Sequence, residues 1–115
     1  MKVLIVDDNQ ALAENLGELL EDEGHQVRLA NGAADAMSLL GESEAIDFAL
    51  VDICLGEDDG VALAEKLKNA VPALRLVLMT AYTAEARVTR AEALEIGPIL
   101  PKPLPLEALV QMLAQ

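Results

Sequence analysis

Short apolar segments alternate with amphipathic segments along the whole chain, and this alternation predicts an α/β fold. The apolar runs are only a few residues long and rich in Val, Ile and Leu, which is typical of strands buried on both faces of a sheet. The predicted strands comprise residues 2–6, 26–30, 48–53, 74–79 and 99–100. The predicted helices comprise residues 10–23, 33–40, 60–71, 84–96 and 105–114.

Residues that favour helix ends stand at several of the predicted boundaries. Gly24 follows the first helix, at the position where a helix C-terminus favours glycine. Asp59 precedes helix 60–71 and Thr83 precedes helix 84–96. We expect the side-chain oxygens of both residues to cap these helices.

A strand followed by a helix occurs five times, which predicts a parallel sheet with right-handed crossovers and helices on both faces. The last strand, 99–100, lies between Pro98 and Pro101 and is therefore expected at an edge of the sheet. We expect residues 56–60 to form an acidic loop.

The net charge and the composition exclude several classes of function. Eight Lys and Arg against twenty Asp and Glu give a net charge of −12, which repels a phosphate backbone, so direct nucleic-acid binding is not expected. Hydrophobic residues make up 53% of the chain, too many for a disordered acidic tail. Phe48 and Tyr82 are the only aromatic residues, which excludes a platform for stacking bases.

The cysteine content and the absence of long apolar runs indicate the cellular compartment of the protein. The single cysteine, Cys54, cannot form an internal disulfide. No apolar run approaches the ~20 residues of a membrane span, and residues 1–8 are too short and too acidic for a signal peptide. We therefore expect a small acidic globular domain that is cytoplasmic and has no membrane contact.

Polar side chains follow the C-terminal ends of four predicted strands. They are Asp7, Asp8, Asp52, Thr80 and Lys102. In a parallel sheet these strand ends share one edge, where open α/β sheets bind their ligands. We therefore expect three carboxylates, a hydroxyl and an ammonium in one crevice.

The residue types in this crevice indicate phosphoryl chemistry. Clustered carboxylates repel one another and need a cation, and oxygen donors without a His–Cys set favour Mg²⁺ over zinc. A carboxylate can attack phosphorus to give an aspartyl phosphate, with Mg²⁺ and a lysine balancing the charge. The sequence contains no P-loop, nucleophilic triad or glycine-rich dinucleotide loop.

The order and spacing of these residues resemble those of a known family, the receiver domains of bacterial two-component response regulators. The resemblance covers nearly the whole chain and rests on Asp7–Asp8, Asp52, Thr80 and Lys102–Pro103. It implies a flavodoxin-like (βα)5 three-layer sandwich with a parallel five-stranded sheet in the order 2-1-3-4-5. It also implies a single receiver domain over residues 1–115.

The resemblance implies a metal-dependent phosphoacceptor site. Asp52 would accept a phosphoryl group in a Mg²⁺-dependent reaction. Asp8, the Asp52 carboxylate and the backbone carbonyl of Cys54 would bind the Mg²⁺ directly, and Asp7 would act through a metal-bound water.

The resemblance also assigns the groups around the phosphoryl group. Lys102 would pair with Asp52 or its phosphoryl group, through a Lys102–Pro103 peptide that is usually cis in the family. Thr80 would move to hydrogen-bond the phosphoryl group. Cys54 and Tyr82 would flank the pocket at positions that tune the rate of phosphate loss.

Partners follow from the same resemblance. The phosphodonor would be a sensor histidine kinase or a histidine phosphotransfer protein that docks near helix 10–23. A downstream output domain or protein would sense the face formed by helix 84–96, strand 99–100 and helix 105–114, and a homodimer could form through it. The domain would assist its own phosphorylation and dephosphorylation without being a conventional enzyme.

Two positions depart from the family pattern. Gly56 stands where the family commonly has proline, which predicts a looser loop, and Ile99 stands where it usually has Tyr or Phe, which normally turns inward when the threonine moves. Two alternatives therefore stay open: a constitutive protein-binding module, and a small Mg²⁺-dependent phosphatase with Asp52 as its nucleophile. Against the phosphatase alternative, the sequence shows no substrate-covering domain and no second acid placed to protonate a leaving group.

Overall fold

Five parallel strands form the central sheet of the computed structural model, which describes residues 1–41, 45–81, 85–102 and 104–114. They are β1 (Lys2–Val6), β2 (Gln26–Ala30), β3 (Phe48–Asp52), β6 (Arg75–Thr80) and β7 (Ile99–Pro101). Their order is β2-β1-β3-β6-β7. Because β6 and β7 are the fourth and fifth strands of this sheet, the predicted order 2-1-3-4-5 is confirmed, with β7 at an edge.

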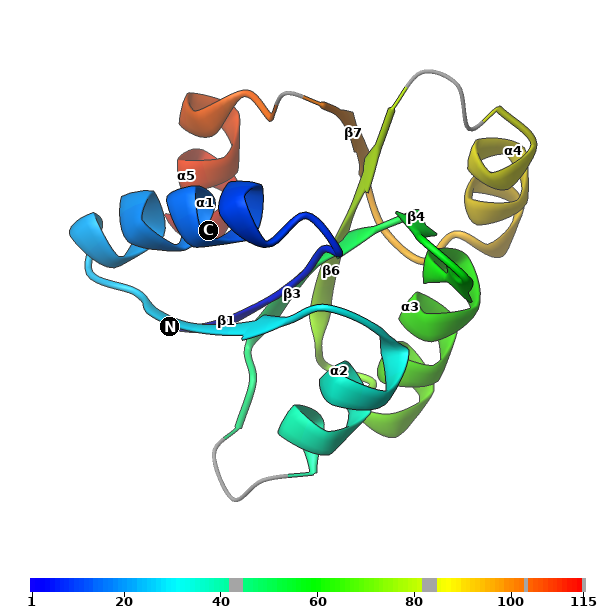
Figure 1. Cartoon of the computed structure of the whole chain (residues 1–115), viewed down its shortest axis with the longest axis horizontal. Helices are drawn as coiled ribbons and strands as arrows, with labels where there is room; N and C mark the ends of the chain where they lie inside the picture. Colours follow the sequence, from blue (N-terminus) through cyan, green and yellow to red (C-terminus); the bar gives the residue numbers. More distant parts are fainter. Residues whose placement is uncertain (42–44, 82–84, 103, 115) are drawn as a thin grey trace.

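Helices cover both faces of the sheet and complete the predicted three layers (Figure 1). On one face lie α1 (Gln10–Asp22) and α5 (Leu106–Ala114). On the other lie α2 (Ala33–Leu40), α3 (Gly60–Ala70) and α4 (Glu85–Leu94). Within the described ranges, every helix is too short or too polar to cross a membrane.

Two hydrophobic cores, one on each face, follow from the alternation of side chains along the strands. In β1, Val3 and Ile5 contribute to the core under α1 and α5, whereas Leu4 and Val6 contribute to the core under α2, α3 and α4. All five residues of β3 are buried, as expected for a strand in the middle of a covered sheet. The continuous apolar runs of the sequence therefore reflect burial on both faces.

The expected caps are present at the helix ends that the structure describes. The Asp59 carboxylate accepts hydrogen bonds from the backbone N–H groups of Val61 and Ala62 at the start of α3. Gly24 follows α1 with a φ of +94°, in the left-handed region that favours glycine. The predicted cap Thr83 lies outside the described residues.

The prediction of an acidic loop at 56–60 is wrong, because most of this segment belongs to regular structure. Strands β4 (Cys54–Leu55) and β5 (Asp58–Asp59) pair as an antiparallel hairpin, and Gly60 already belongs to α3. Gly56 allows the two-residue turn because its φ is +63°, a conformation that proline cannot adopt. Two adjacent aspartates disfavour a strand, so local residue preferences do not indicate this hairpin.

Several predicted boundaries differ from the observed ones by one or two residues. The predicted helix 84–96 ends at Leu94, because Glu95 has a φ of 52° and its N–H bonds back to the carbonyl of Glu92. The fourth strand begins at Arg75 and includes Thr80, and the third ends at Asp52. The first and third helices end one residue earlier than predicted, and the last begins one residue later.

The N-terminus of α2 is capped by a residue distant in sequence. Its N-cap, Gly32, has no side chain to accept a hydrogen bond, and the backbone N–H of Ala33 instead donates to Oδ2 of Asp58 at 2.8 Å. The negative charge of Asp58 also complements the positive end of the helix dipole. The hairpin that follows β3 therefore holds α2 in place.

We expect Gly60→Ala to lower the free energy of unfolding by about 2–3 kcal/mol, a size typical of overpacking. A Cβ at this position would overlap the backbone carbonyl of Asp52, which has no flexible end that could move aside. Gly41→Ala is the control, because its Cβ would make only ordinary contacts. Urea denaturation of both variants measures the difference, and equal stabilities would contradict the close approach of α3 to β3.

Candidate functional site

The polar residues expected at the sheet edge do meet there. Asp7 and Asp8 follow β1, Asp52 and Thr80 end β3 and β6, and Lys102 follows β7. Asp7, Asp52 and Thr80 are the buried polar or charged residues of the described chain, whereas Asp8 is exposed. The parallel sheet thus collects on one edge residues that are up to 95 positions apart in the sequence.

Lys102 bridges two of the carboxylates. Its Nζ lies 2.6 Å from Oδ2 of Asp52 and 2.9 Å from Oδ2 of Asp7. The contact with Asp52 agrees with the expectation from the sequence, and the contact with Asp7 was not foreseen. The backbone N–H of Lys102 donates to the carbonyl of Thr80 at 2.9 Å. This hydrogen bond fixes the backbone of Lys102 against the end of β6.

The two buried carboxylates also accept hydrogen bonds from backbone groups close to them in the chain. Oδ1 of Asp7 accepts from the N–H of Asn9, and Oδ1 of Asp52 accepts from the N–H of Cys54, both at 2.9 Å. Asn9 in turn caps α1 by accepting from the N–H of Leu12. The carboxylates are therefore oriented before any ligand binds.

The carboxylate cluster is compatible with a divalent cation. One oxygen each from Asp7, Asp8 and Asp52 lies within 4.8 Å of the others. Hard oxygen donors suit Mg²⁺, and the exposure of Asp8 leaves one side of the cluster open to the water ligands that Mg²⁺ keeps. These residues therefore fit the metal that their chemistry implies.

Thr80 completes the edge beside the lysine. Its side chain is buried, and its Oγ1 donates a hydrogen bond to the carbonyl of Ala81 at 2.8 Å. The hydroxyl is thus engaged with its neighbour and not with Asp52. Tyr82 and Pro103, which the resemblance also places near the pocket, lie outside the described residues.

Burial and ion pairing shift the pKa values of the central pair. Burial raises the pKa of Asp52 above its ordinary value, and the hydrogen bond and charge of Lys102 only partly offset this effect. Burial works to lower the pKa of Lys102, but its hydrogen bonds with Asp52 and Asp7 outweigh burial and hold the pKa above its ordinary value. Lys102 therefore stays a cation at neutral pH.

One further contact near the site had no signal in the sequence. The Arg87 side chain of α4 donates a hydrogen bond from Nη1 to the sulfur of Cys54 at 3.1 Å. Cys54 is partly buried and adjoins the buried end of β3. A contact between residues 33 positions apart depends on how α4 is rotated on the sheet, which local sequence patterns do not specify.

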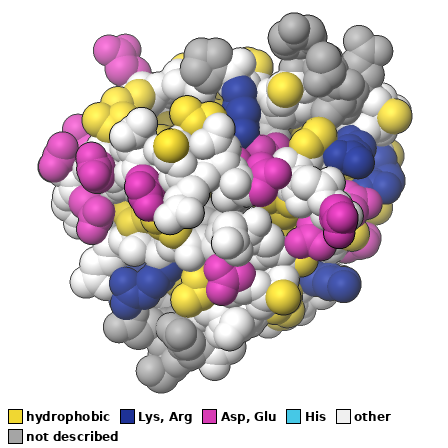
Figure 2. Space-filling model, viewed as in Figure 1, with side chains coloured by type: hydrophobic (Ala, Val, Ile, Leu, Met, Phe, Trp, Pro, Cys, Tyr) yellow, Lys and Arg dark blue, Asp and Glu magenta, His cyan; other side chains and the backbone are white. Residues whose placement is uncertain are grey.

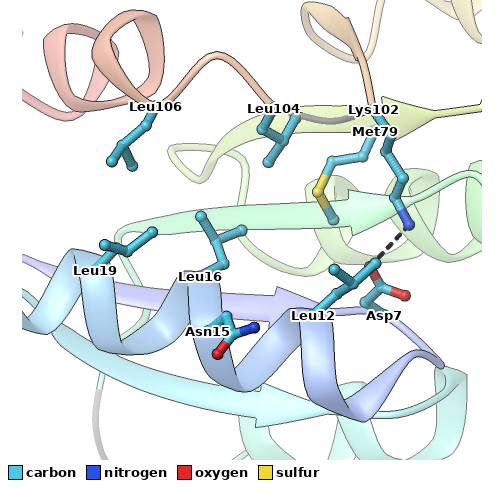
Figure 3. Close-up of a pocket in the computed structure, with 9 residues that line it drawn as sticks. All are labelled: Asp7, Leu12, Asn15, Leu16, Leu19, Met79, Lys102, Leu104 and Leu106. Carbon is cyan, nitrogen blue, oxygen red and sulfur yellow. Dashed lines mark hydrogen bonds and ion pairs between the residues drawn. The ribbon is translucent and has the colours of Figure 1, made fainter.

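An apolar hollow of about 400 Å³ adjoins the carboxylates between α1 and the chain that leads into α5 (Figure 3). Leucines dominate its lining. The residues that line it are Asp7, Leu12, Asn15, Leu16, Leu19, Met79, Lys102, Leu104 and Leu106. Leu12 and Leu19 are 50% and 44% exposed, so the hollow opens to the surface on the α1 side.

The surface over α1 is acidic. Figure 2 shows Asp and Glu side chains spread over this side of the molecule. The exposed acidic residues of α1 are Glu14, Glu18, Glu21 and Asp22. An apolar hollow bordered by negative charge favours a partner that carries positive charge.

The sequence matches a known family model and is similar to several known proteins. The family model described as "Response regulator receiver domain" matches residues 3–114. The alginate biosynthesis transcriptional regulatory protein AlgB of Pseudomonas putida is 35% identical over 96 residues, covering 84% of this chain and 21% of AlgB. The sensor protein TorS of Escherichia coli is 32% identical over 114 residues, covering 99% of this chain and 12% of TorS.

Solved structures agree with this similarity. A response regulator from Burkholderia pseudomallei, crystallised with a phosphorylated aspartic acid, calcium ion and citrate, superposes with a TM-score of 0.86. It is 32% identical, and the alignment covers 95% of this chain and 64% of that protein. The chain spans only about a fifth of AlgB and less of TorS, so it corresponds to one part of those longer proteins.

We expect Asp52→Asn to raise the free energy of unfolding at pH 7 in a metal-free buffer. The raised pKa means that the folded state binds a proton to Asp52 more tightly than the unfolded chain does, so stability falls as the pH rises through this pKa. The neutral amide of Asn at position 52 does not ionise, so the variant does not lose this stability. Below the ordinary pKa of aspartate both states are protonated, and the gain should disappear.

Urea denaturation between pH 3 and pH 8 measures this effect. Glu57→Gln, which neutralises an exposed residue in the turn of the hairpin, is the control and should show no comparable gain. An Asp52→Asn protein that is no more stable than the wild type at pH 7 would show that Lys102 fully compensates the buried charge.

Proposed function

Because this chain belongs to the response regulator receiver domain family of two-component systems, we propose that Asp52 is its phosphoacceptor. The observation that carries the proposal is the 2.6 Å contact between Asp52 and Lys102 within a cluster of three carboxylates. This arrangement offers a nucleophile, a cation for the incoming phosphoryl group and oxygen ligands for a metal. The phosphodonor is a phosphohistidine of a sensor kinase or of a histidine phosphotransfer protein.

In the proposed reaction, a carboxylate oxygen of Asp52 attacks the phosphorus of the phosphohistidine. The new O–P bond forms as the P–N bond breaks, and the imidazole nitrogen leaves with the electron pair. Attack of water on the resulting acyl phosphate breaks the O–P bond, which releases inorganic phosphate and restores the carboxylate. Both steps take place among the charged side chains of the site, through which the domain would assist its own phosphorylation and dephosphorylation.

Mg²⁺ would supply positive charge beside the transferring phosphoryl oxygens. Asp8, the Asp52 carboxylate and the backbone carbonyl of Cys54 would hold it, with Asp7 acting through a water. The clustering of the three aspartate side chains within 4.8 Å supports this assignment. The side chain of Asp7 already contacts Lys102, which suits a residue that binds the metal indirectly.

Lys102 and Thr80 would respond to the phosphoryl group. The Lys102 ammonium is already beside Oδ2 of the Asp52 carboxylate, and it can pair with the new phosphoryl oxygens. Thr80 would release the Ala81 carbonyl and donate its hydroxyl hydrogen to a phosphoryl oxygen. This movement would change the face formed by α4, β7 and α5, to which output partners or a second copy of the chain bind.

One observation favours a second candidate, a constitutive binding module. A hollow of about 600 Å³ lies between α4 and β7, lined in part by Thr80, Val88 and Ile99. Ile99 lacks the ring that usually turns inward beside the threonine. A module of this kind would bind its partner equally well with and without phosphate on Asp52.

The apolar hollow beside α1 suits the phosphodonor. It opens directly beside Asp7 and Lys102, so a helix seated on Leu12 and Leu16 could bring a histidine to Asp52. The acidic residues of α1 would attract basic residues on that helix. The docking surface and the phosphoacceptor would then act together.

We expect one labile phosphoryl group on the wild type after incubation with acetyl phosphate and Mg²⁺, measured by intact mass. The adduct should be absent from Asp52→Asn and from wild type treated with a chelator. Asp58→Asn, which neutralises a nearby exposed carboxylate, should be labelled like the wild type. A wild type that stays unlabelled while another receiver domain is labelled under the same conditions would contradict the proposal.

We expect Leu12→Glu to slow phosphotransfer from a phosphorylated histidine phosphotransfer domain by roughly tenfold, equivalent to ~1.4 kcal/mol. Labelling by acetyl phosphate needs no docking surface and should be unchanged. Met37→Glu is the control, because Met37 is also exposed but lies on α2, across the sheet. If Leu12→Glu also slowed labelling by acetyl phosphate, the variant would have damaged the site at Asp52 instead of the docking surface.

A further inference from the structure

Two arginines of α4 connect this helix to the β4–β5 hairpin. Arg87 donates to the sulfur of Cys54, and Arg90 forms an ion pair with Asp59. On the side of the molecule where α4 lies, Lys and Arg side chains are next to Asp and Glu side chains (Figure 2). Only the Arg87 contact involves the residue whose N–H binds the Asp52 carboxylate.

The contact of Arg87 is weak for a guanidinium group. A thiol sulfur is a poor hydrogen-bond acceptor, whereas guanidinium donors bind oxyanions strongly and often through two parallel hydrogen bonds. In the described part of the chain, Cys54 is the hydrogen-bond acceptor of Arg87. The guanidinium is therefore held at the residue whose N–H binds the Asp52 carboxylate, by a bond that a phosphoryl oxygen can replace.

The helix that carries Arg87 is lightly held. Ala91 is buried, but this small side chain offers little apolar surface, and Val88 is only partly buried at the margin of the core. The hollow between α4 and β7 leaves room beside the helix. A segment with few buried contacts needs little free energy to shift.

Resting on the function proposed above, we propose that Arg87 is a positioning residue that couples Asp52 to α4 by exchanging the Cys54 sulfur for a phosphoryl oxygen. In the unphosphorylated protein it anchors α4 at the hairpin. A phosphoryl group on Asp52 adds strong acceptor oxygens and replaces the single negative charge of the carboxylate with close to two, which attract the guanidinium. Because Arg90 remains paired with Asp59, the movement is concentrated in the half of α4 that carries Arg87.

This exchange gives the chain a way to report phosphorylation without an aromatic residue at position 99. The coupling passes from Asp52 to the guanidinium through space, and Ile99 need not rotate. Arg87 touches no reacting atom in the unphosphorylated protein, so its effect should appear in the position of α4 and not in the ability of Asp52 to be labelled.

The test is two-dimensional ¹H–¹⁵N NMR of the whole chain with saturating acetyl phosphate and Mg²⁺. In the wild type we expect shifts of the Asp52, Cys54 and Thr80 amides, of the α4 amides, and of the side-chain Nε–Hε signal of Arg87. In Arg87→Ala the amides near Asp52 should still shift, while the α4 displacements should fall to less than half. Arg90→Ala, which removes the same charge from the same helix, should retain the α4 displacements.

The outcomes separate this inference from the function on which it rests. Absence of any shift near Asp52 in the wild type, together with no mass adduct, would overturn the proposed function. Shifts near Asp52 with equal α4 displacements in the wild type and Arg87→Ala would overturn the coupling alone. An unmoved Arg87 Nε–Hε signal in the phosphorylated wild type would also overturn it, and this readout needs no variant.

Discussion

The organisation of the sheet edge depends on the attraction between one ammonium group and two buried carboxylates. Asp7 and Asp52 are only 4% and 5% exposed and come from adjacent strands, so they would repel each other strongly without Lys102. The lysine comes from the far end of the chain and is fixed by its backbone bond to Thr80. One interaction thus ties the first, third and last strands of the sheet together and assembles the groups to which the proposed phosphoryl transfer is assigned.

Much of the fold could be predicted because burial on two faces leaves a clear pattern in the sequence. The runs Lys2–Val6 and Gln26–Ala30 were identified with their observed bounds, and the repeated strand–helix unit indicated the parallel order. The β4–β5 hairpin was missed because it depends on the left-handed conformation of Gly56 and on the pairing of two aspartates with Cys54 and Leu55. The end of α4 was also missed, since Glu95 adopts a positive φ without being glycine.

The meeting of the site residues was predictable for a geometric reason: residues at the C-terminal ends of parallel strands must share an edge. Their individual contacts were predictable only in part. Lys102 meets Asp52 as expected, but its second bond to Asp7 and the contact of Arg87 with Cys54 depend on side-chain directions and helix rotation. Roles that require a bound phosphoryl group or metal depend on groups that no pattern in the sequence represents.

Because Asp58 of the β4–β5 hairpin caps α2, the hairpin and the first turn of α2 should unfold locally as one unit. Gly32 offers no cap of its own, so opening of the hairpin leaves the first turn of α2 without its acceptor. The amide hydrogen of Ala33 should therefore exchange with solvent at a rate governed by the hairpin and not by α2. Any event at Asp52 that tightens or loosens the hairpin is then transmitted to α2 as a change in hydrogen-exchange protection.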